Sequence, residues 1–139
     1  MNLFDSDHVS LLHRDGAEGR RIQAKIAASS EPIALCIVTY EEQMRGWLAE
    51  IAKTLLATRQ KPIYARLNEM LEIYCATPLL PFDDAAIAIY ENLLRQRVGI
   101  GTMDLKIAAI ALANDATLLT RNLSDFSKVL GLRIEDWAV

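Results

Sequence analysis

Apolar residues in this chain form two kinds of run, which predict two kinds of secondary structure. Five short runs are apolar almost throughout, a pattern typical of strands that are covered on both faces in a parallel sheet. Six longer runs repeat apolar residues with the spacing of an amphipathic helix. The expected strands are residues 2–5, 33–39, 77–82, 116–120 and 132–137, and the expected helices are residues 6–14, 18–29, 40–57, 63–75, 84–98 and 103–115.

Polar side chains mark the starts of four of these helices. We expect N-caps at Ser6, Thr39, Asp83 and Thr102, because each side chain can accept a hydrogen bond from a free backbone N–H group of the first turn. The two helices within residues 40–75 are separated by a short break and are predicted to form an antiparallel helical hairpin. Strands alternate with helices elsewhere, which predicts an α/β fold with helices on both faces of a mainly parallel sheet of four to five strands.

Length and composition predict a single domain, residues 1–139. A chain of 139 residues that is 52% hydrophobic can bury a substantial core, and it contains no internal repeat, low-complexity tract or linker. Eighteen acidic and fifteen basic residues give a net charge of −3, so no overall basic field attracts a polyanion. If nucleic acid is the substrate, local groups or metal ions must supply the positive charge.

The cysteines and the lack of long apolar stretches bear on the compartment. Cys36 and Cys75 follow no metal-binding or disulfide pattern, and we interpret both as packing residues. The chain has no run of eighteen apolar residues and no leader-like N-terminus. We therefore expect a cytoplasmic protein that does not enter a membrane.

Four acidic residues lie where the predicted strands end or where a helix begins beside them. Asp5 ends the first strand, Glu42 follows the second, Asp125 follows the fourth, and Asp104 lies in the first turn of the helix before the fourth strand. Ligands of open parallel sheets bind beyond the carboxyl ends of the strands. The sequence therefore predicts that four carboxylates from separate segments converge at one edge of the sheet.

Such a convergence requires a cation. Two unit charges at about 4 Å repel by roughly 4 kcal/mol at an effective dielectric constant of 20, and without a cation one carboxyl group would take up a proton. An oxygen donor set without His or Cys favours Mg²⁺ or Mn²⁺ over Zn²⁺. The alternative is a local role for each acid, as a turn residue, a helix cap, part of a solvated helix face or a first-turn acid that the helix dipole stabilises.

Short motifs occur in four segments at a characteristic spacing. LFDSDHVS is an apolar strand followed by D-[ST]-[ND], and IVTYEEQMRG corresponds to ITVxELxxG. GTMDLKIAAIAL matches G-[ST]-x-D-x-x-I-A-A, and LLTRNLSDFSKVLGLRIEDW matches an ending with T-x-N-x-x-D-F. In this order the motifs resemble the PIN-domain family, specifically the VapC-type toxins of bacterial toxin–antitoxin pairs. The resemblance covers nearly the whole chain and implies a PIN-like three-layer α/β/α sandwich.

The resemblance implies which acids bind metal. Asp5, Glu42 and Asp104 occupy the positions of the family's metal-binding acids. Glu42 is preferred to Glu41 because it lies four residues before Gly46, as the family motif requires. Glu41 remains the alternative.

The fourth acidic position and the surrounding polar contacts are also implied by the resemblance. Relatives place the fourth acid at a position that corresponds to either Asn122 or Asp125, and we prefer Asp125 for its charge. Supporting polar or phosphate contacts are expected from Ser6, Asp7, Thr120, Lys106 and Arg121, with Asn122 if it does not fill the fourth position. His8 and His13 are interpreted as surface or capping residues.

The implied activity is hydrolysis of RNA phosphodiester bonds that depends on Mg²⁺ or Mn²⁺ and leaves a 5′ phosphate and a 3′ hydroxyl. Asp5 and Asp104 would be direct ligands, and Glu42 and Asp125 would bind a second ion or hold metal-bound water. The family also implies a homodimer and an antitoxin partner whose C-terminal segment lies in an apolar groove and blocks the acids. The predicted hairpin offers apolar residues that either line such a groove or belong to the core: Trp47, Ile51, Leu55, Ile63, Leu67 and Leu71.

Two other functions remain open at this point. One is a PIN-like fold that has lost catalysis and acts only as a binding module. The other is a receiver-like Mg²⁺-binding signalling domain, which would need a phosphoacceptor Asp ending its third strand and a Lys after its fifth. Here the third strand ends in PFDD and the fifth leads to Asp136 and Trp137 without that Lys.

Overall fold

Five strands form one sheet in the order β3-β2-β1-β4-β5 in the computed structural model, which describes residues 1–139. All four strand pairs are parallel, and Leu3 in the central strand lies opposite Ala34 on one side and Leu118 on the other. The strands are β1 (Asn2–Phe4), β2 (Ile33–Cys36), β3 (Leu79–Leu80), β4 (Thr117–Leu119) and β5 (Arg133–Glu135). Each is shorter than its predicted range, but the predicted parallel sheet is confirmed.

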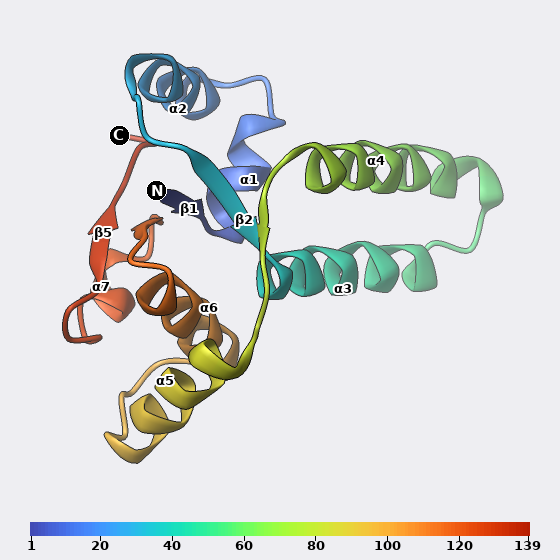
Figure 1. The fold of residues 1–139 in the computed structure, drawn as a ribbon. Helices are drawn as coiled ribbons and strands as arrows, with labels where there is room; N and C mark the ends of the chain where they lie inside the picture. The colour runs from blue at the N-terminus through green and yellow to red at the C-terminus, as the bar shows by residue number, and fades with distance from the viewer.

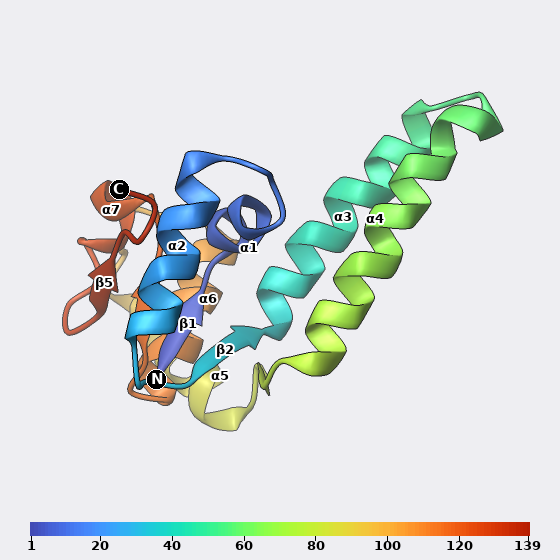
Figure 2. The same ribbon diagram turned by 90° about the horizontal axis from the view of Figure 1, so that it is seen from above.

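Seven helices connect and flank the strands (Figure 1). They are α1 (Ser6–Leu12), α2 (Ala17–Ala28), α3 (Ile37–Lys53), α4 (Ala57–Ala76), α5 (Asp84–Arg95), α6 (Thr102–Ala113) and α7 (Leu123–Phe126). The predicted hairpin is formed by α3 and α4, and it projects away from the sheet and its covering helices (Figure 2). The short helix α7 was not predicted.

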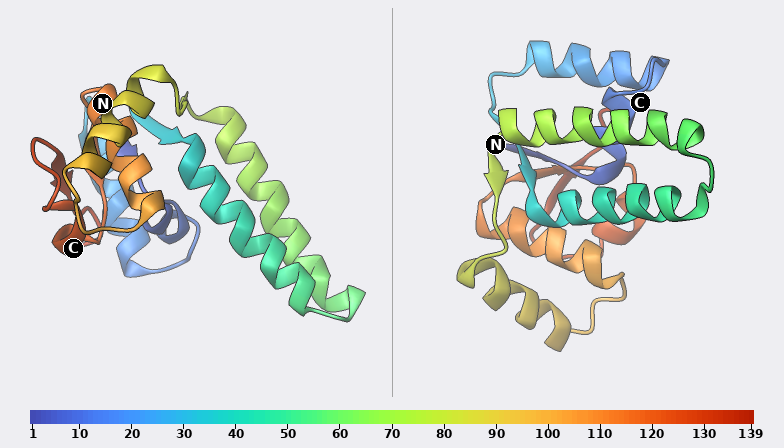
Figure 3. Two further views of the ribbon diagram at one scale, coloured as in Figure 1. Left: turned by 90° about the horizontal axis from the view of Figure 1, so that it is seen from below. Right: turned by 90° about the vertical axis from the view of Figure 1, so that its right-hand side faces the viewer.

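Adjacent residues of each strand face opposite sides of the sheet, so the protein has two apolar cores. Leu3 and Leu118 belong to a core that α5 and α6 cover, whereas Phe4 and Leu119 belong to a core with residues of α1, α2 and α4. The right-hand view of Figure 3 shows α2 and the α5–α6 pair on opposite sides of the strands. The predicted three-layer α/β/α arrangement is confirmed.

Three of the four predicted N-caps are wrong. Asp5, not Ser6, caps α1, and Gly101, not Thr102, precedes α6. Helix α3 begins at Ile37, so Thr39 lies inside its first turn, fully buried, with its hydroxyl 3.2 Å from the Cys36 sulfur. Only the prediction for Asp83 is confirmed, since its side chain accepts from the backbone N–H of Ala86.

Helix α4 begins six residues earlier than predicted and includes Pro62. A proline in the second turn removes one backbone hydrogen bond near the helix start, where little of the helix precedes it. Cys36 is buried as expected, but Cys75 on α4 is exposed and is therefore not a packing residue. None of the helices is long and apolar enough to span a membrane.

Candidate active site

The carboxyl end of β1 supplies Asp5, which links two neighbouring strands to a helix. Its backbone N–H donates to the carbonyl of Leu119 at the end of β4 (3.1 Å), and its carboxylate accepts from the backbone N–H of His8 (2.9 Å) as the N-cap of α1. Only 8% of Asp5 is exposed. Its carboxylate is therefore held at the edge of the sheet where the strands end.

Glu42 reaches this edge from the second turn of α3. Its carboxylate accepts a hydrogen bond from the Ser6 hydroxyl at 3.1 Å, and the residue is half-buried. Burial raises the pKa of Glu42, the Ser6 hydrogen bond opposes this shift, and the charges of Asp104, Asp5 and Asp7 raise the pKa further. These effects place Glu42 in the same electrostatic environment as Asp5 at the end of β1, Asp7 of α1 and Asp104 of α6.

Its neighbour Glu41 points elsewhere. The Glu41 carboxylate forms an ion pair with Arg45 one turn further along α3, at 2.6 Å. Glu41 also lines a surface depression with Phe82 and Lys106, apart from the one that Glu42 and Ser6 share. Of the two adjacent glutamates, the structure thus directs Glu42 toward the other acids.

Asp104 lies in the first turn of α6 and is half-buried. Burial raises its pKa, and the negative charges of Asp125, Asp5 and Asp7 add to the effect. Asp7 itself is exposed on α1 and contributes through its charge. Acids at the end of β1, on α1 and in the segment after β4 therefore all act on the charge of Asp104.

Asp125 and Asn122 both belong to the segment that follows β4. Asn122 caps α7, and its side-chain amide donates to the Asp125 carboxylate at 3.0 Å, while Lys128 lies 3.5 Å from the other carboxylate oxygen. The Asn122 hydrogen bond, with Lys128, lowers the pKa of Asp125. The buried Thr120 hydroxyl accepts from the Asn122 backbone N–H at 2.9 Å. Thr120 thus orders this loop, which in turn orients Asp125.

The donor atoms of this cluster suit a hard divalent cation. The side chains form no group of three or more His, Cys, Asp and Glu residues arranged to hold a metal ion. However, Mg²⁺ takes oxygen ligands, retains several waters and needs only one or two carboxylates from the protein. A cation among these acids would also offset the repulsion that raises the pKa of Glu42 and Asp104.

The two basic residues expected near phosphate occupy different surroundings. The Lys106 ammonium lies over the rings of Phe82 and Tyr90, at 5.7 and 5.9 Å from the ring centres. This contact gives Lys106 a packing role against α5. Arg121 is exposed in the loop after β4, two residues beyond Leu119.

Sequence reasoning missed Gln43, which connects three helices beside the acids. Its amide nitrogen donates to the Ser6 carbonyl at 3.5 Å and to the Ser10 hydroxyl at 3.4 Å, and its oxygen accepts from the Tyr74 hydroxyl at 2.7 Å. These bonds join α1, α3 and α4. The only signal in the sequence was the position of Gln43 directly after Glu42.

The histidines of α1 also differ from one another. His8 was predicted to be a surface or capping residue, and this prediction is wrong because its side chain is fully buried. The α1 segment turns His8 toward the core that contains Phe4 and Trp137. His13 is exposed and forms the C-cap of α1, in agreement with the prediction.

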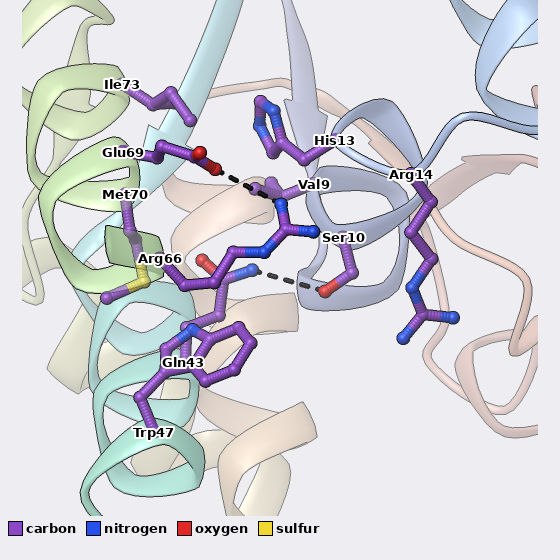
Figure 4. Close-up of a pocket in the computed structure, with 10 residues that line it drawn as sticks. All are labelled: Val9, Ser10, His13, Arg14, Gln43, Trp47, Arg66, Glu69, Met70 and Ile73. Carbon is purple, nitrogen blue, oxygen red and sulfur yellow. Dashed lines mark hydrogen bonds and ion pairs between the residues drawn. The ribbon is translucent and has the colours of Figure 1, made fainter. Parts of the chain in front are cut away.

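A small pocket of about 120 Å³ lies between α1, α3 and α4 (Figure 4). It adjoins the acids, because Ser10, Gln43 and Trp47 line both this pocket and the depression that contains Glu42. Arg66 extends from α4 across the pocket and pairs with Glu69 at 3.1 Å (Figure 4). The remaining lining residues are Val9, His13, Arg14, Met70 and Ile73. The pocket therefore combines apolar walls with basic groups.

Comparison with known proteins identifies similar sequences. The model of the PIN domain family matches residues 4–131. Ribonuclease VapC1 of Rickettsia felis is 38% identical over 60 residues, a segment that covers 40% of this chain and 45% of that protein. The match thus spans less than half the length of this curated relative.

Solved structures similar to this fold cover almost the entire chain. The crystal structure of FitAcB from Neisseria gonorrhoeae has a TM-score of 0.73 and 24% identity, and the match covers 99% of this chain and 98% of that one. A toxin–antitoxin complex from Klebsiella pneumoniae contains a chain with a TM-score of 0.69 and 20% identity, with coverage of 99% and 98%. At these identities the likeness shows a shared fold.

Proposed function

This chain belongs to the PIN-domain family, and on that premise we propose that it is a metal-dependent endoribonuclease, acting in the cytoplasm as the toxin of a toxin–antitoxin pair. The observation that carries the proposal is the raised pKa of both Glu42 and Asp104, which burial and the charges of neighbouring acids, Asp5 among them, produce at the carboxyl edge of the sheet. A carboxyl group whose pKa is raised in this way destabilises the folded protein when it is ionised, and a bound cation would offset that cost.

Asp5 and Asp104 are proposed to hold Mg²⁺ or Mn²⁺ directly, and Glu42 and Asp125 to hold a second ion or metal-bound water. A bound divalent cation supplies positive charge for the phosphate oxygens and lowers the pKa of water. Within the chain, the Ser6 hydroxyl orients the Glu42 carboxylate, and the Thr120–Asn122 bond fixes the loop that carries Asp125. Hydrolysis would leave a 5′ phosphate and a 3′ hydroxyl.

The test compares neighbouring residues on the same helix. We expect Glu42→Gln to lower the rate of RNA cleavage in Mg²⁺ or Mn²⁺ by at least about 10-fold, because loss of even an outer contact to a metal ligand costs about 10–100-fold. Glu41→Gln is the matched control, since Glu41 pairs only with Arg45 on the surface, and its cleavage rate should stay within about twofold. Asp5→Asn and Asp104→Asn should lose cleavage as Glu42→Gln does, and EDTA should abolish cleavage by the unmodified protein.

Two outcomes would contradict the proposal in different ways. Undiminished cleavage by Asp5→Asn and Asp104→Asn would remove the proposed site. Lack of cleavage by the unmodified protein on every RNA tested, with a partner protein still bound, would favour a PIN-fold binding module without catalysis.

The proposed partner is an antitoxin whose terminal segment enters the pocket between α1, α3 and α4. Trp47 lines that pocket, and a segment there would lie beside Glu42 and obstruct RNA. Of the apolar hairpin residues, Leu67 packs partly against the core, whereas Leu71 is 53% and Leu55 93% exposed. Leu55 and Leu71 thus remain available to the antitoxin or to a second copy of this chain in a homodimer.

A further inference from the structure

We propose that His8 is a positioning residue that holds the Asp5 carboxylate in its ligating orientation through an Nδ1–H group. The inference rests on the proposed function, because it assigns Asp5 to the metal-binding set. It concerns a residue outside the acidic cluster and a contact between the start and the end of the chain. His8 and Trp137, which meet through this contact, are 129 positions apart.

The His8 imidazole has no access to solvent. Its side chain is 0% exposed and packs in the core that includes Phe4 and Trp137, with the Phe4 ring centre at 6.0 Å. Its Nδ1 atom is the one buried side-chain nitrogen or oxygen in the structure that has no hydrogen-bond partner. Buried polar groups almost always have a partner, so this atom requires one.

The C-terminal segment determines which ring nitrogen carries the proton. The backbone N–H of Trp137 donates to Nε2 of His8 at 3.1 Å, so Nε2 presents its lone pair. Asp136 also lies near Nε2, at 3.6 Å, but its carboxylate accepts from the backbone N–H of Ala138 at 2.8 Å. A neutral imidazole that accepts at Nε2 must carry its proton on Nδ1.

Asp5 offers an acceptor for that proton. The nearest carboxylate oxygen to Nδ1 is Oδ1 of Asp5 at 3.5 Å, the same oxygen that accepts from the His8 backbone N–H. A shift of a few tenths of an ångström would bring Nδ1–H and Oδ1 into an ordinary hydrogen bond. A carboxylate that is anchored in this way presents its second oxygen in a fixed direction, as histidine and carboxylate partners do around metal ligands.

Helix α2 holds the C-terminal segment that contacts His8. Arg21 donates to the carbonyl of Ala138 at 2.6 Å, and Lys25 lies 3.5 Å from the carbonyl of Asp136. The segment 136–138 is thereby held where Trp137 can meet His8. A series of contacts thus runs from α2 through the C-terminal segment to His8 and from His8 to Asp5.

Two substitutions separate the functions of the two ring nitrogens. Asn places an amide nitrogen near the position of Nδ1, so His8→Asn keeps a donor for Asp5 and loses the acceptor for Trp137. Gln reaches the position of Nε2, so His8→Gln keeps that acceptor and loses the donor. Both replace the same buried ring with a smaller amide side chain, and each serves as the control for the other.

We expect His8→Gln to weaken Mn²⁺ binding, followed by the electron paramagnetic resonance of free Mn²⁺, by about 10–100-fold and to slow RNA cleavage to a similar extent. His8→Asn should bind Mn²⁺ within about threefold of the unmodified protein. Nitrogen-15 NMR of the metal-free protein should find the proton of His8 on Nδ1. Equal loss of Mn²⁺ affinity in both variants, or a proton on Nε2, would overturn the proposal.

The two proposals fail in different ways. If the unmodified protein binds Mn²⁺ but cleaves no RNA, the endoribonuclease proposal fails, while the affinities of the two variants still decide the role of His8. If the unmodified protein cleaves RNA and the two variants behave alike, the role of His8 is refuted and the endoribonuclease proposal stands.

Discussion

Asp104 lies in the first turn of α6, where the helix dipole favours a negative charge, yet its pKa is raised. Burial is the largest cause, followed by the charges of Asp125, Asp5 and Asp7. A carboxyl group whose pKa is higher in the folded than in the unfolded protein makes stability fall as pH rises between the two values. At neutral pH the ionised Asp104 therefore lowers the stability of the metal-free protein.

We accordingly expect Asp104→Asn to raise the free energy of unfolding of the metal-free protein at pH 7. The gain should not exceed about 1 kcal/mol, because solvent screens a half-exposed charge. It should shrink as pH falls through the raised pKa toward the ordinary carboxyl value of about 3.9. Urea unfolding in EDTA at several pH values measures this difference, and added Mg²⁺ should stabilise the unmodified protein more than the variant.

Asp84 provides a matched control for this prediction. It is an exposed acid in the first turn of α5, where the helix dipole favours its negative charge. Asp84→Asn should therefore lower stability at pH 7 by about 0.3–1 kcal/mol. If Asp104→Asn also lowers the free energy of unfolding, as Asp84→Asn should, then repulsion among the acids is not important for the fold.

At the scale of elements, the contact between α1 and α2 depends on one glycine. A Cβ atom at Gly19 would lie 2.5 Å from the carbonyl oxygen of Leu11 and 3.1 Å from that of Arg14. Both are backbone atoms of the α1 end and its following turn, which cannot rotate away as a side chain can. The close approach of α2 to α1 thus requires glycine at this position.

We expect Gly19→Ala to lower the free energy of unfolding by about 1–3 kcal/mol through this overlap. Gly46→Ala is the control, because it also lies inside a helix but has no atom within 4 Å of its Cβ position. That substitution should raise stability by about 0.5–1 kcal/mol through the helix propensity of alanine. Thermal or urea unfolding distinguishes the two, and a stabilised Gly19→Ala variant would show that α2 can move away.

Helices and strands were predicted best where the apolar residues follow one periodicity. The residues at which these elements begin and end were predicted worst. Ile37 and Val38 extend an apolar run whether they belong to a strand or to a first helical turn, so the sequence placed the start of α3 too late. The rule that ligands bind beyond the carboxyl ends of parallel strands led to Asp5 and Glu42 as candidate site residues, because the rule needs only the order of the elements. His8 was missed because its burial depends on Trp137, a contact that no local pattern contains.

On the scale of the whole molecule, the sheet joins two cores, whereas much of the hairpin is outside both. Neighbouring residues of β1, Leu3 and Phe4, belong to different cores, so neither core can open without affecting the central strand. In α3 the buried residues are Val38 and Thr39, and in α4 they are Met70 and Tyr74. All of these lie at the end of the hairpin nearest the sheet. Between them, residues 40–69 include no buried residue.

This distribution predicts a gradient of local stability along the hairpin. Segments with few buried apolar contacts open at lower free energy than the core, and their backbone amides exchange sooner. In hydrogen exchange measured by mass spectrometry on the dilute protein, peptides from residues 48–64 should exchange well before those of β1 and β4. Raising the protein concentration should slow exchange in the hairpin if a second copy covers Leu48, Leu55 and Leu71, which are exposed in the single chain. Protection of residues 48–64 that equals that of β1 in a monomer at every concentration would contradict the gradient, and light scattering on the same samples establishes which species is present.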